Sequence, residues 1–269
     1  VGYFAISSGV GTVRSTLDHN PSALSLGASF ERSIVVADTQ TLAEVDAQSV
    51  MLSRLTSNST SLFVSEEMSQ DFERFRFNKD TVGAIAFEGG VITGNRTGDA
   101  AFVSQAELDA VADEEMPVQA FGDIGEAGYV SLDIDGSEGQ PIRVDYEGSI
   151  ENAVVMLLGH STTSSDPYVL RVVDRDATGF SFVVDGWEYE SRLNVSGRFV
   201  FWVAVEAGVH ELSDGRILEA GTVLAAKDSG SVSFSASFGD EAPVVVTSVM
   251  SVLDDTAVDS DPLNITSTG

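Results

Sequence analysis

The sequence predicts an all-β protein made of tandem antiparallel β-sandwich modules, with one short helix in an insertion. Three observations support this prediction. Short runs rich in Val and Ile recur between polar stretches of Gly, Ser, Asn and Asp, which is typical of many short strands. One strand-like segment occurs three times in similar form, and longer stretches around it recur as well. Hydrophobic residues make up 43% of the 269 residues, enough for a sizeable core.

The expected strands are short apolar runs. The clearest are "SIVV" (33–36), "AVVMLL" (153–158), "FVFWVAV" (199–205) and "PVVVTSV" (243–249). None approaches the roughly 20 apolar residues that a membrane-spanning helix needs. The sequence therefore predicts no membrane insertion.

The repeated closing strand reads "VGYFAISSG" at 1–9, "VGAIAFEGG" at 82–90 and "VFWVAVEAG" at 200–208. Longer matches join "SALSLGASFERSIVV" (22–36) to "SVSFSASFGDEAPVVV" (231–246), with "IRVDYEGSIENAVV" (142–155) as a weaker middle copy. This alignment makes the aromatics Phe30, Tyr146 and Phe238 equivalent. The pattern predicts a tandem array.

Four ranges follow: the C-terminal fragment of a preceding module at 1–27, a β-sandwich module with an insertion at 28–141, a second β-sandwich module at 142–230, and the N-terminal fragment of a following module at 231–269. Because there is no initiator Met and no signal peptide, the sequence is expected to be a mature product or an excerpt of a longer polypeptide. Because it begins with the end of one module and finishes with the start of another, it is expected to be a window of a longer repeat protein. A module fragment leaves sheet edges unpaired. We therefore expect a neighbouring chain or further sequence to complete the end fragments, and completion between copies would give an open polymer.

One helix is expected, in the insertion of the first module. The stretch "SQAELDAVADEEMP" (104–117) starts with Ser104 as the cap, has Glu107 three residues later, and stops at Pro117. Leu108 and Val111 share one face of this helix. We expect it to lie across an edge of the sandwich.

The net charge of −28, from 42 acidic and 14 basic residues, excludes nucleic acid as a partner because such a surface repels phosphate. Two explanations of this charge stay open. The protein is adapted to a medium in which salt or bound cations reduce the self-repulsion, or the charge only keeps it soluble. The absence of Cys excludes disulfides, Cys-ligated zinc and thiol catalysis.

Calcium is the one cofactor that the sequence suggests, because Ca²⁺ prefers carboxylate and carbonyl oxygens. The first candidate ligands lie in "LDDTAVDSDPL" (253–263) and are Asp254, Asp255, Asp259 and Asp261. The second candidates lie in "DIDGSEG" (133–139) and are Asp133 and Asp135. The alternative is chance clustering in so acidic a chain.

Four Asn-x-Ser/Thr triplets are candidate glycosylation sites, at Asn58, Asn95, Asn194 and Asn264. Catalysis finds no support, and the chain is predicted not to be an enzyme. The three histidines, His19, His160 and His210, lie far apart in polar, loop-like stretches, which favours surface imidazoles. The chain contains neither a nucleophile elbow nor a phosphate-binding Gly loop.

The stretch "ATGFSFVVDGWEYESRLNVSGRFVFWVAVEAG" (177–208) resembles the H-type lectin domain. The shared features are a Thr-Gly-Phe turn into a strand, a Trp, and a closing strand of the form Trp-x-Ala that ends near a Gly. The matching residues are Thr178, Gly179, Phe180, Trp187, Trp202, Ala204 and Gly208. The resemblance covers residues 154–208 well and the first module loosely, and it extends to modules repeated in long secreted proteins of marine microbes.

The resemblance implies an antiparallel β-sandwich that binds N-acetylgalactosamine or a related sugar as a trimer. The candidate sugar-binding residues that it implies are Asp185, Trp187 and Arg192. An aromatic face stacks on sugar C–H groups, while a carboxylate and a guanidinium bond hydroxyls. The alternative is that Trp187 and Trp202 are core aromatics. Ala84 stands in the first module where the second has Trp202, which counts against a sugar site in each copy.

The sequence favours an extracellular structural or adhesive repeat protein at the cell surface, a filament subunit assembled head to tail from copies of itself. The alternative function is a carbohydrate-binding lectin of the H-type class, with surface glycans as partners.

Overall fold

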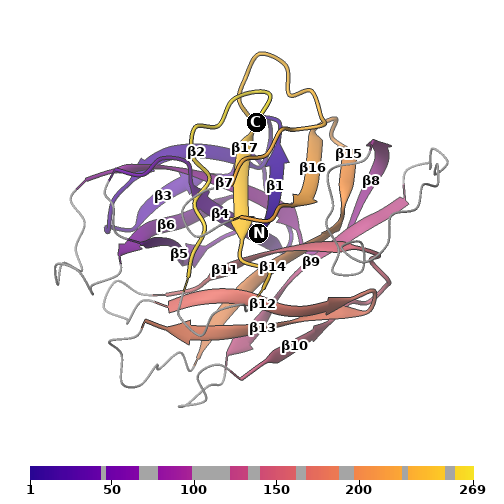
Figure 1. Ribbon diagram of the computed structural model, residues 1–269. Coiled ribbons are helices and arrows are strands. Elements are labelled where there is room, and N and C mark those ends of the chain that lie inside the picture. The colour runs from indigo at the N-terminus through magenta and orange to yellow at the C-terminus, as the bar shows by residue number, and fades with distance from the viewer. Residues whose placement is uncertain are drawn as a thin grey trace.

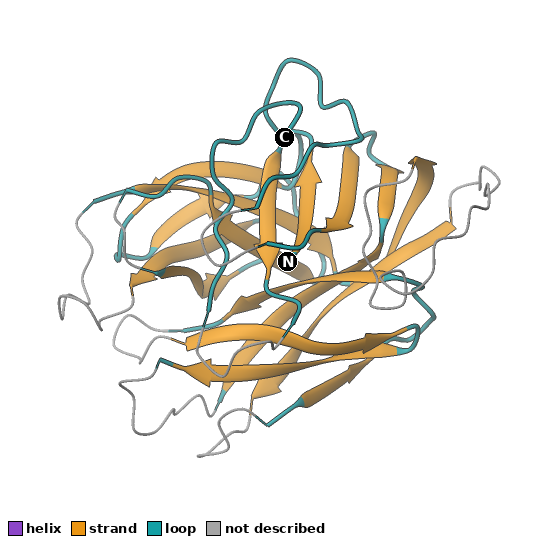
Figure 2. Ribbon diagram, in the orientation of Figure 1, coloured by secondary structure: helices purple, strands orange, loops and turns teal. Residues whose placement is uncertain are grey.

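The computed structural model describes residues 1–43, 47–66, 78–98, 122–132, 140–161, 168–187, 197–225, 230–251 and 258–269. Within these ranges the chain is all-β, and its named strands pair antiparallel, which confirms the predicted class (Figure 2). None of the described residues forms a helix long and apolar enough to cross a membrane. The helix expected at 104–117 lies outside these ranges.

Seventeen strands lie in the described ranges. They are β1 (Gly2–Ile6), β2 (Thr12–Leu17), β3 (Ser22–Ser25), β4 (Ser33–Thr39), β5 (Gln48–Leu55), β6 (Ser59–Glu66), β7 (Asp80–Glu88), β8 (Gly90–Gly98), β9 (Gly122–Leu132), β10 (Ile142–Asp145), β11 (Ala153–Gly159), β12 (Tyr168–Asp176), β13 (Gly179–Gly186), β14 (Arg198–Glu206), β15 (Gly208–Leu212), β16 (Ile217–Thr222) and β17 (Val244–Ser248). The four apolar runs singled out in the sequence are β4, β11, β14 and β17, as predicted.

The strands form one large sheet and three small ones. The large sheet has eight strands in the order β11-β14-β9-β8-β15-β16-β1-β17. The small sheets have three strands each, in the orders β10-β13-β12, β2-β7-β4 and β3-β6-β5. Figure 1 shows β10, β12 and β13 as a layer below β11, β14 and β9, with the strands from β2 to β7 on the other side.

Two parts of the chain share one pattern of strand pairing. The order β2-β7-β4 recurs as β9-β14-β11, and the order β3-β6-β5 recurs as β10-β13-β12. The registers agree down to an irregularity: β5 has a bulge between Leu52 and Arg54, and β12 has one between Val172 and Asp174. The offset from Leu52 to Val172 is 120 residues. A bulge places an extra residue at a defined position, so its recurrence is a specific match.

The register corrects the alignment of aromatic residues. Leu26 N–H donates to Asn58 O (2.9 Å), and Tyr146 N–H donates to Thr178 O (2.8 Å) in the same place of the second pattern. Tyr146 therefore corresponds to Leu26, and its alignment with Phe30 is wrong. The physical reason is that a core position needs an apolar side chain to bury, and an aliphatic one serves as well as an aromatic one.

The central strand β14 contributes to two cores, because successive side chains of a strand point to opposite faces. One face packs with β4, β7 and β1 in the largest core and presents Phe201, Val203 and Val205. The other face packs with β10, β12 and β13 and presents Val200, Trp202 and Ala204. The large sheet is therefore covered on both sides here.

The first strand is paired on both edges within the chain. Gly2 lies opposite Thr222 of β16 and opposite Ser248 of β17. The expectation that this strand needs a neighbouring chain is therefore wrong for β1. Its two partners come from distant parts of the sequence, which the sequence pattern does not reveal.

The strand pairings also differ from two of the sequence-based boundaries. β2 and β3 fall in the range 1–27, assigned to a preceding module, but they pair with β7 and β6. β9 falls in the range 28–141, but it pairs with β14 of the next range. The boundaries missed these pairings because they were placed at repeated words, whereas sheet membership depends on cross-strand partners.

Candidate functional site

Side chains from the first part of the chain cover the outer edge of β17. The amide of Gln40, a residue 7% exposed, accepts a hydrogen bond from Val245 N–H (3.1 Å) and donates one to Val245 O (2.5 Å). The Asp38 carboxylate accepts hydrogen bonds from the N–H (2.9 Å) and hydroxyl (2.6 Å) of Thr247. These side chains take the place of a neighbouring strand, which an uncovered edge would otherwise attract.

Gly83 of β7 leaves room for this contact. A Cβ at Gly83 would lie 2.8 Å from Val244 Cγ1 and 2.9 Å from Gln40 Cδ, closer than carbon atoms pack. Arg14 of β2, opposite Gly83, donates a hydrogen bond to Pro243 O. β17 is therefore held by β2, β4 and β7 together.

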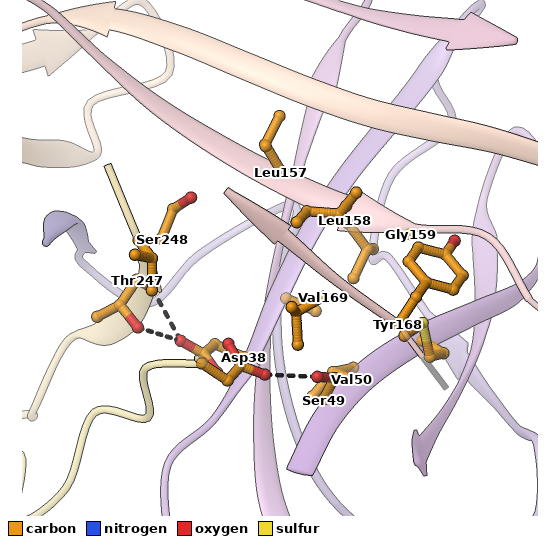
Figure 3. A pocket seen from close by; sticks show the side chains of 15 residues that line it. Asp38, Ser49, Val50, Leu157, Leu158, Gly159, Tyr168, Val169, Thr247 and Ser248 are labelled. Atoms are coloured by element: carbon orange, nitrogen blue, oxygen red, sulfur yellow. Dashed lines mark hydrogen bonds between the residues drawn. The ribbon is translucent and has the colours of Figure 1, made fainter. Parts of the chain in front are cut away.

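A small polar cavity lies where β4, β5, β11, β12 and β17 meet (Figure 3). Its volume is about 50 Å³. The lining includes the polar side chains of Asp38, Ser49, Thr247, Ser248 and Asp259. A buried water needs about 10–15 Å³ of such space, so there is room for a few waters. Sites for small molecules measure about 300–1,000 Å³, so this cavity does not fit a sugar ring.

Three carboxylates gather beside this cavity. Asp259 accepts a hydrogen bond from the Ser49 hydroxyl (2.5 Å), and Asp261 accepts one from the Thr39 hydroxyl (2.5 Å). Burial, reinforced by the negative charges of Asp261 and Asp259, raises the pKa of Asp38 well above its ordinary value. A proton on Asp38 therefore relieves part of the repulsion at this joint.

Only two of the six predicted calcium ligands, Asp259 and Asp261, lie among the described residues. Among the residues that the structure describes, no group of three or more His, Asp or Glu side chains is arranged to hold a metal ion. Asp259 and Asp261 instead bond hydroxyls of the chain, as above. The other four candidates, Asp133, Asp135, Asp254 and Asp255, lie outside the described residues. Calcium binding stays a prediction.

The candidate sugar-binding carboxylate is engaged inside the protein. Asp185 on β13 accepts a hydrogen bond from Arg171 Nε (2.7 Å), and Arg171 Nη2 also donates to it. The side chain of Arg171 is 5% exposed and that of Asp185 is 14% exposed. Trp187 lies half-buried just after β13, and Arg192 lies outside the described residues. Of the two described candidates, Asp185 is therefore held by Arg171 and is not an open ligand at the surface.

Trp202 is a core residue, as the alternative interpretation expected. It is 7% exposed, and its ring lies 5.6 Å from Phe180 and 6.1 Å from Tyr146, measured between centroids. A ring of this size hides a large apolar surface in this core. Its place in the sequence resemblance therefore reflects packing.

An exposed aromatic pair, which was not among the candidates predicted from the sequence, lies on β9 and β14. Tyr129 on β9 is 60% exposed and Phe199 on β14 is 37% exposed, and their rings meet edge to face at 5.7 Å. Phe201 lies 6.1 Å from Tyr129, and His160 lies 6.0 Å from Phe199. Alternation along "RFVFW" would have shown that Phe199 points away from the Trp202 core.

Three of the candidate glycosylation sites are described. Asn58 lies exposed in the turn between β5 and β6, and Asn264 lies exposed with a φ of 55°. Asn95 is half-buried within β8, which leaves less room for a glycan. Asn194 lies outside the described residues.

The histidines differ from the expectation of surface imidazoles. His210 is fully buried in β15, between β8 and β16. Its Nε2–H donates to Glu206 O (2.7 Å), and its Nδ1 finds no hydrogen-bond partner among the described residues. His19 and His160 are half-buried. The expectation for His210 is wrong because its polar neighbours in sequence hid a position inside the sheet.

Comparison of the chain with known protein families, curated proteins and solved structures finds no match. The likeness of residues 154–208 to the H-type lectin domain therefore rests on the residues themselves.

Proposed function

We propose that the chain is an extracellular structural or adhesive protein made of tandem β-sandwich modules, the subunit of a cell-surface filament assembled head to tail. The observation that supports this most is the strand pairing pattern that occurs twice, down to its bulge. Repeated units build length from contacts between neighbours alone.

The contact of Asp38 and Gln40 with β17 supports a load-bearing role. The side chains of Asp38 and Gln40 bond the backbone at the outer edge of β17. The first part of the chain therefore binds β17 without strand-to-strand hydrogen bonds at that edge. The charge of −28 suits a medium rich in salt or calcium, which would reduce repulsion between such units. Calcium bound by acidic loops would stiffen the joints.

Electron microscopy of the native material, with and without a calcium chelator, tests this proposal. The expected result is regular fibres whose subunit repeat matches one chain, with loss of order on chelation. Particles of a single chain at every concentration, confirmed by light scattering, would contradict it. Fibres that stay ordered after chelation would support the structural role but would exclude calcium as part of the joints.

The exposed pair Tyr129 and Phe199 favours a second candidate function, that of a carbohydrate-binding lectin. Exposed aromatic faces stack on sugar C–H groups, and this pair is more accessible than the half-buried Trp187. A glycan array tests it with Tyr129→Ala and with Trp187→Ala. Binding lost only in Tyr129→Ala would assign the aromatic pair, binding lost only in Trp187→Ala would assign the lectin-like site, and no binding would exclude the lectin function.

A further inference from the structure

One turn of the fold carries an Asn-x-Ser/Thr triplet at its tip. The turn joins β5 to β6 and lies in "TSNSTS" (56–61), a run of uncharged residues in a chain of net charge −28. Ser57 and Asn58 at the tip are exposed, whereas Thr60 on β6 is 2% exposed. The triplet therefore runs from an exposed acceptor asparagine into a buried strand.

Backbone hydrogen bonds hold this tip in place and leave its asparagine amide available. Leu26 N–H donates to Asn58 O (2.9 Å), and Phe30 N–H donates to Ser57 O (2.7 Å). The side chain of Asn58 accepts one hydrogen bond at Oδ1, from the Thr56 hydroxyl (3.3 Å). Its Nδ2, which can donate two hydrogen bonds, makes none within the described part of the chain. The atom to which an N-linked sugar attaches thus belongs to an exposed side chain and is not engaged.

The second strand pattern uses the same place differently. Thr178 takes the place of Asn58 there, because its carbonyl accepts the matching backbone hydrogen bond. The Thr178 hydroxyl donates to Asp176 (2.6 Å) and accepts from Arg143 (3.0 Å), so it is part of a charged network within its own turn. The turn at 56–61 contains no charged residue. Asn58 therefore has no corresponding structural task.

The triplet at Asn95 provides a contrast within the same chain. Asn95 lies in β8, opposite Glu211 of β15, in the middle of the eight-stranded sheet. It is half-buried, and its Oδ1 is buried. A sugar on this side chain would have to fit among its neighbours on the sheet, whereas a sugar on Asn58 extends from a hairpin tip into solvent. The same three-residue motif thus occurs once where a glycan fits and once where it does not.

We propose that Asn58 is an N-glycosylation site, to which a host transferase adds an oligosaccharide from a lipid-linked phosphate donor during export. Asn58 Nδ2 forms a bond to the anomeric carbon of the first sugar, the bond from that carbon to the phosphate oxygen breaks, the lipid phosphate leaves, and Nδ2 loses one proton. Because Thr60 is buried in the folded protein, transfer precedes the packing of β6, and the exposed tip then accommodates the glycan. This inference rests on the proposed function, since donor and transferase act on exported chains.

Mass spectrometry of peptides from the native material tests this proposal. The expected result is a peptide with a sugar on Asn58, placed there by fragmentation, and an unmodified peptide that contains Asn95. An unmodified Asn58 would overturn the proposal. So would a sugar on the hydroxyl of Ser57 or Ser59 in its place, or a higher occupancy at Asn95 than at Asn58.

Three variants produced in the native host separate the acceptor from the motif. Asn58→Gln should lose the sugar, Thr60→Ser keeps the hydroxyl of the triplet and should keep the sugar, and Thr60→Val should lose it. Circular dichroism checks that all three are folded. A sugar retained in Thr60→Val would show that the triplet is not what the transferase recognises and would overturn the proposal.

The modification and the proposed function can fail separately. Ordered fibres of a protein with an unmodified Asn58 would reject the modification and keep the structural function. A glycan on Asn58 of a protein that never assembles would keep the modification and reject the filament.

Discussion

Thr60 shows how the same strand pattern holds different cores. It is 2% exposed on β6, and its hydroxyl has no hydrogen-bond partner among the described residues. The corresponding residue of β13 is Phe180, which packs against Trp202. A buried hydroxyl without a partner keeps its desolvation cost, so replacing it with an isosteric methyl group should help.

We therefore expect Thr60→Val to raise the free energy of unfolding by about 1 kcal/mol. Urea unfolding at neutral pH measures the change. The control is Thr56→Val, because the Thr56 hydroxyl donates to Ser59 O (3.1 Å) and its removal should lower stability. A loss of stability in Thr60→Val as large as that in the control would show that the Thr60 hydroxyl is hydrogen-bonded.

His210 makes stability depend on pH. Burial lowers its pKa, as does Arg96 across the strand pair, while the hydrogen bond with Glu206 O acts in the opposite direction. The unfolded chain takes up the proton near pH 6.5 and the folded chain only at lower pH. Stability from this group is therefore complete above about pH 6.5 and is lost as the pH falls toward the lowered folded pKa.

Thermal unfolding between about pH 7.5 and 5.5 tests this effect. The melting temperature of the parent protein should fall more steeply with acid than that of His210→Gln. Because Asp38 has a raised pKa and acts with the opposite sign, only the difference between variant and parent reports on His210. Parallel slopes in the parent and in His210→Gln would contradict the assignment.

At the scale of elements, Gln40 acts as a short substitute for a strand beside β17. In Gln40→Met the side chain keeps its length but loses both hydrogen bonds to Val245. The free energy of unfolding should fall by about 1–3 kcal/mol, because buried peptide groups are left unpaired. Denaturant unfolding measures this fall, and hydrogen exchange should be faster at Val245 in particular. Gln140→Met, at an exposed position, is the matched control and should change neither quantity.

The strands themselves were predictable, but several of their partners were not. Runs such as "AVVMLL" and "PVVVTSV" fit buried strands because nearly every side chain is apolar, and they became β11 and β17. The bond from Asp185 to Arg171 joins neighbouring strands, so no local pattern reveals it. The sequence therefore suggested an exposed sugar-binding carboxylate at Asp185, where the structure has an internal ion pair with Arg171. Matching residues by type also failed where only apolar character was required, as for Leu26 and Tyr146.

At the scale of the molecule, the eight-stranded sheet joins ranges that sequence repeats suggested were separate modules. Its order brings β1 beside β16 and β17, at a separation that no repeat length predicts. The largest core likewise draws Val36, Val203 and Val246 from three parts of the chain into one cluster. Such long-range contacts depend on the whole fold. The sequence repeats therefore predicted modules, but not that these modules share one sheet and one core.

The shared sheet and core predict that the protein unfolds as one cooperative unit. Units that share a sheet and a core lose their stabilising contacts together, whereas independent modules melt in separate steps. Calorimetry of the full chain should give one transition, with a calorimetric enthalpy equal to the van't Hoff enthalpy. Gln40→Met should move that whole transition to lower temperature without splitting it, although the change touches only one edge of β17. Two resolved transitions, or a single transition that splits in the variant, would instead mean that the modules are only loosely coupled. A filament built from such modules would stretch at the contact made by Asp38 and Gln40 with β17 before any sandwich unfolded.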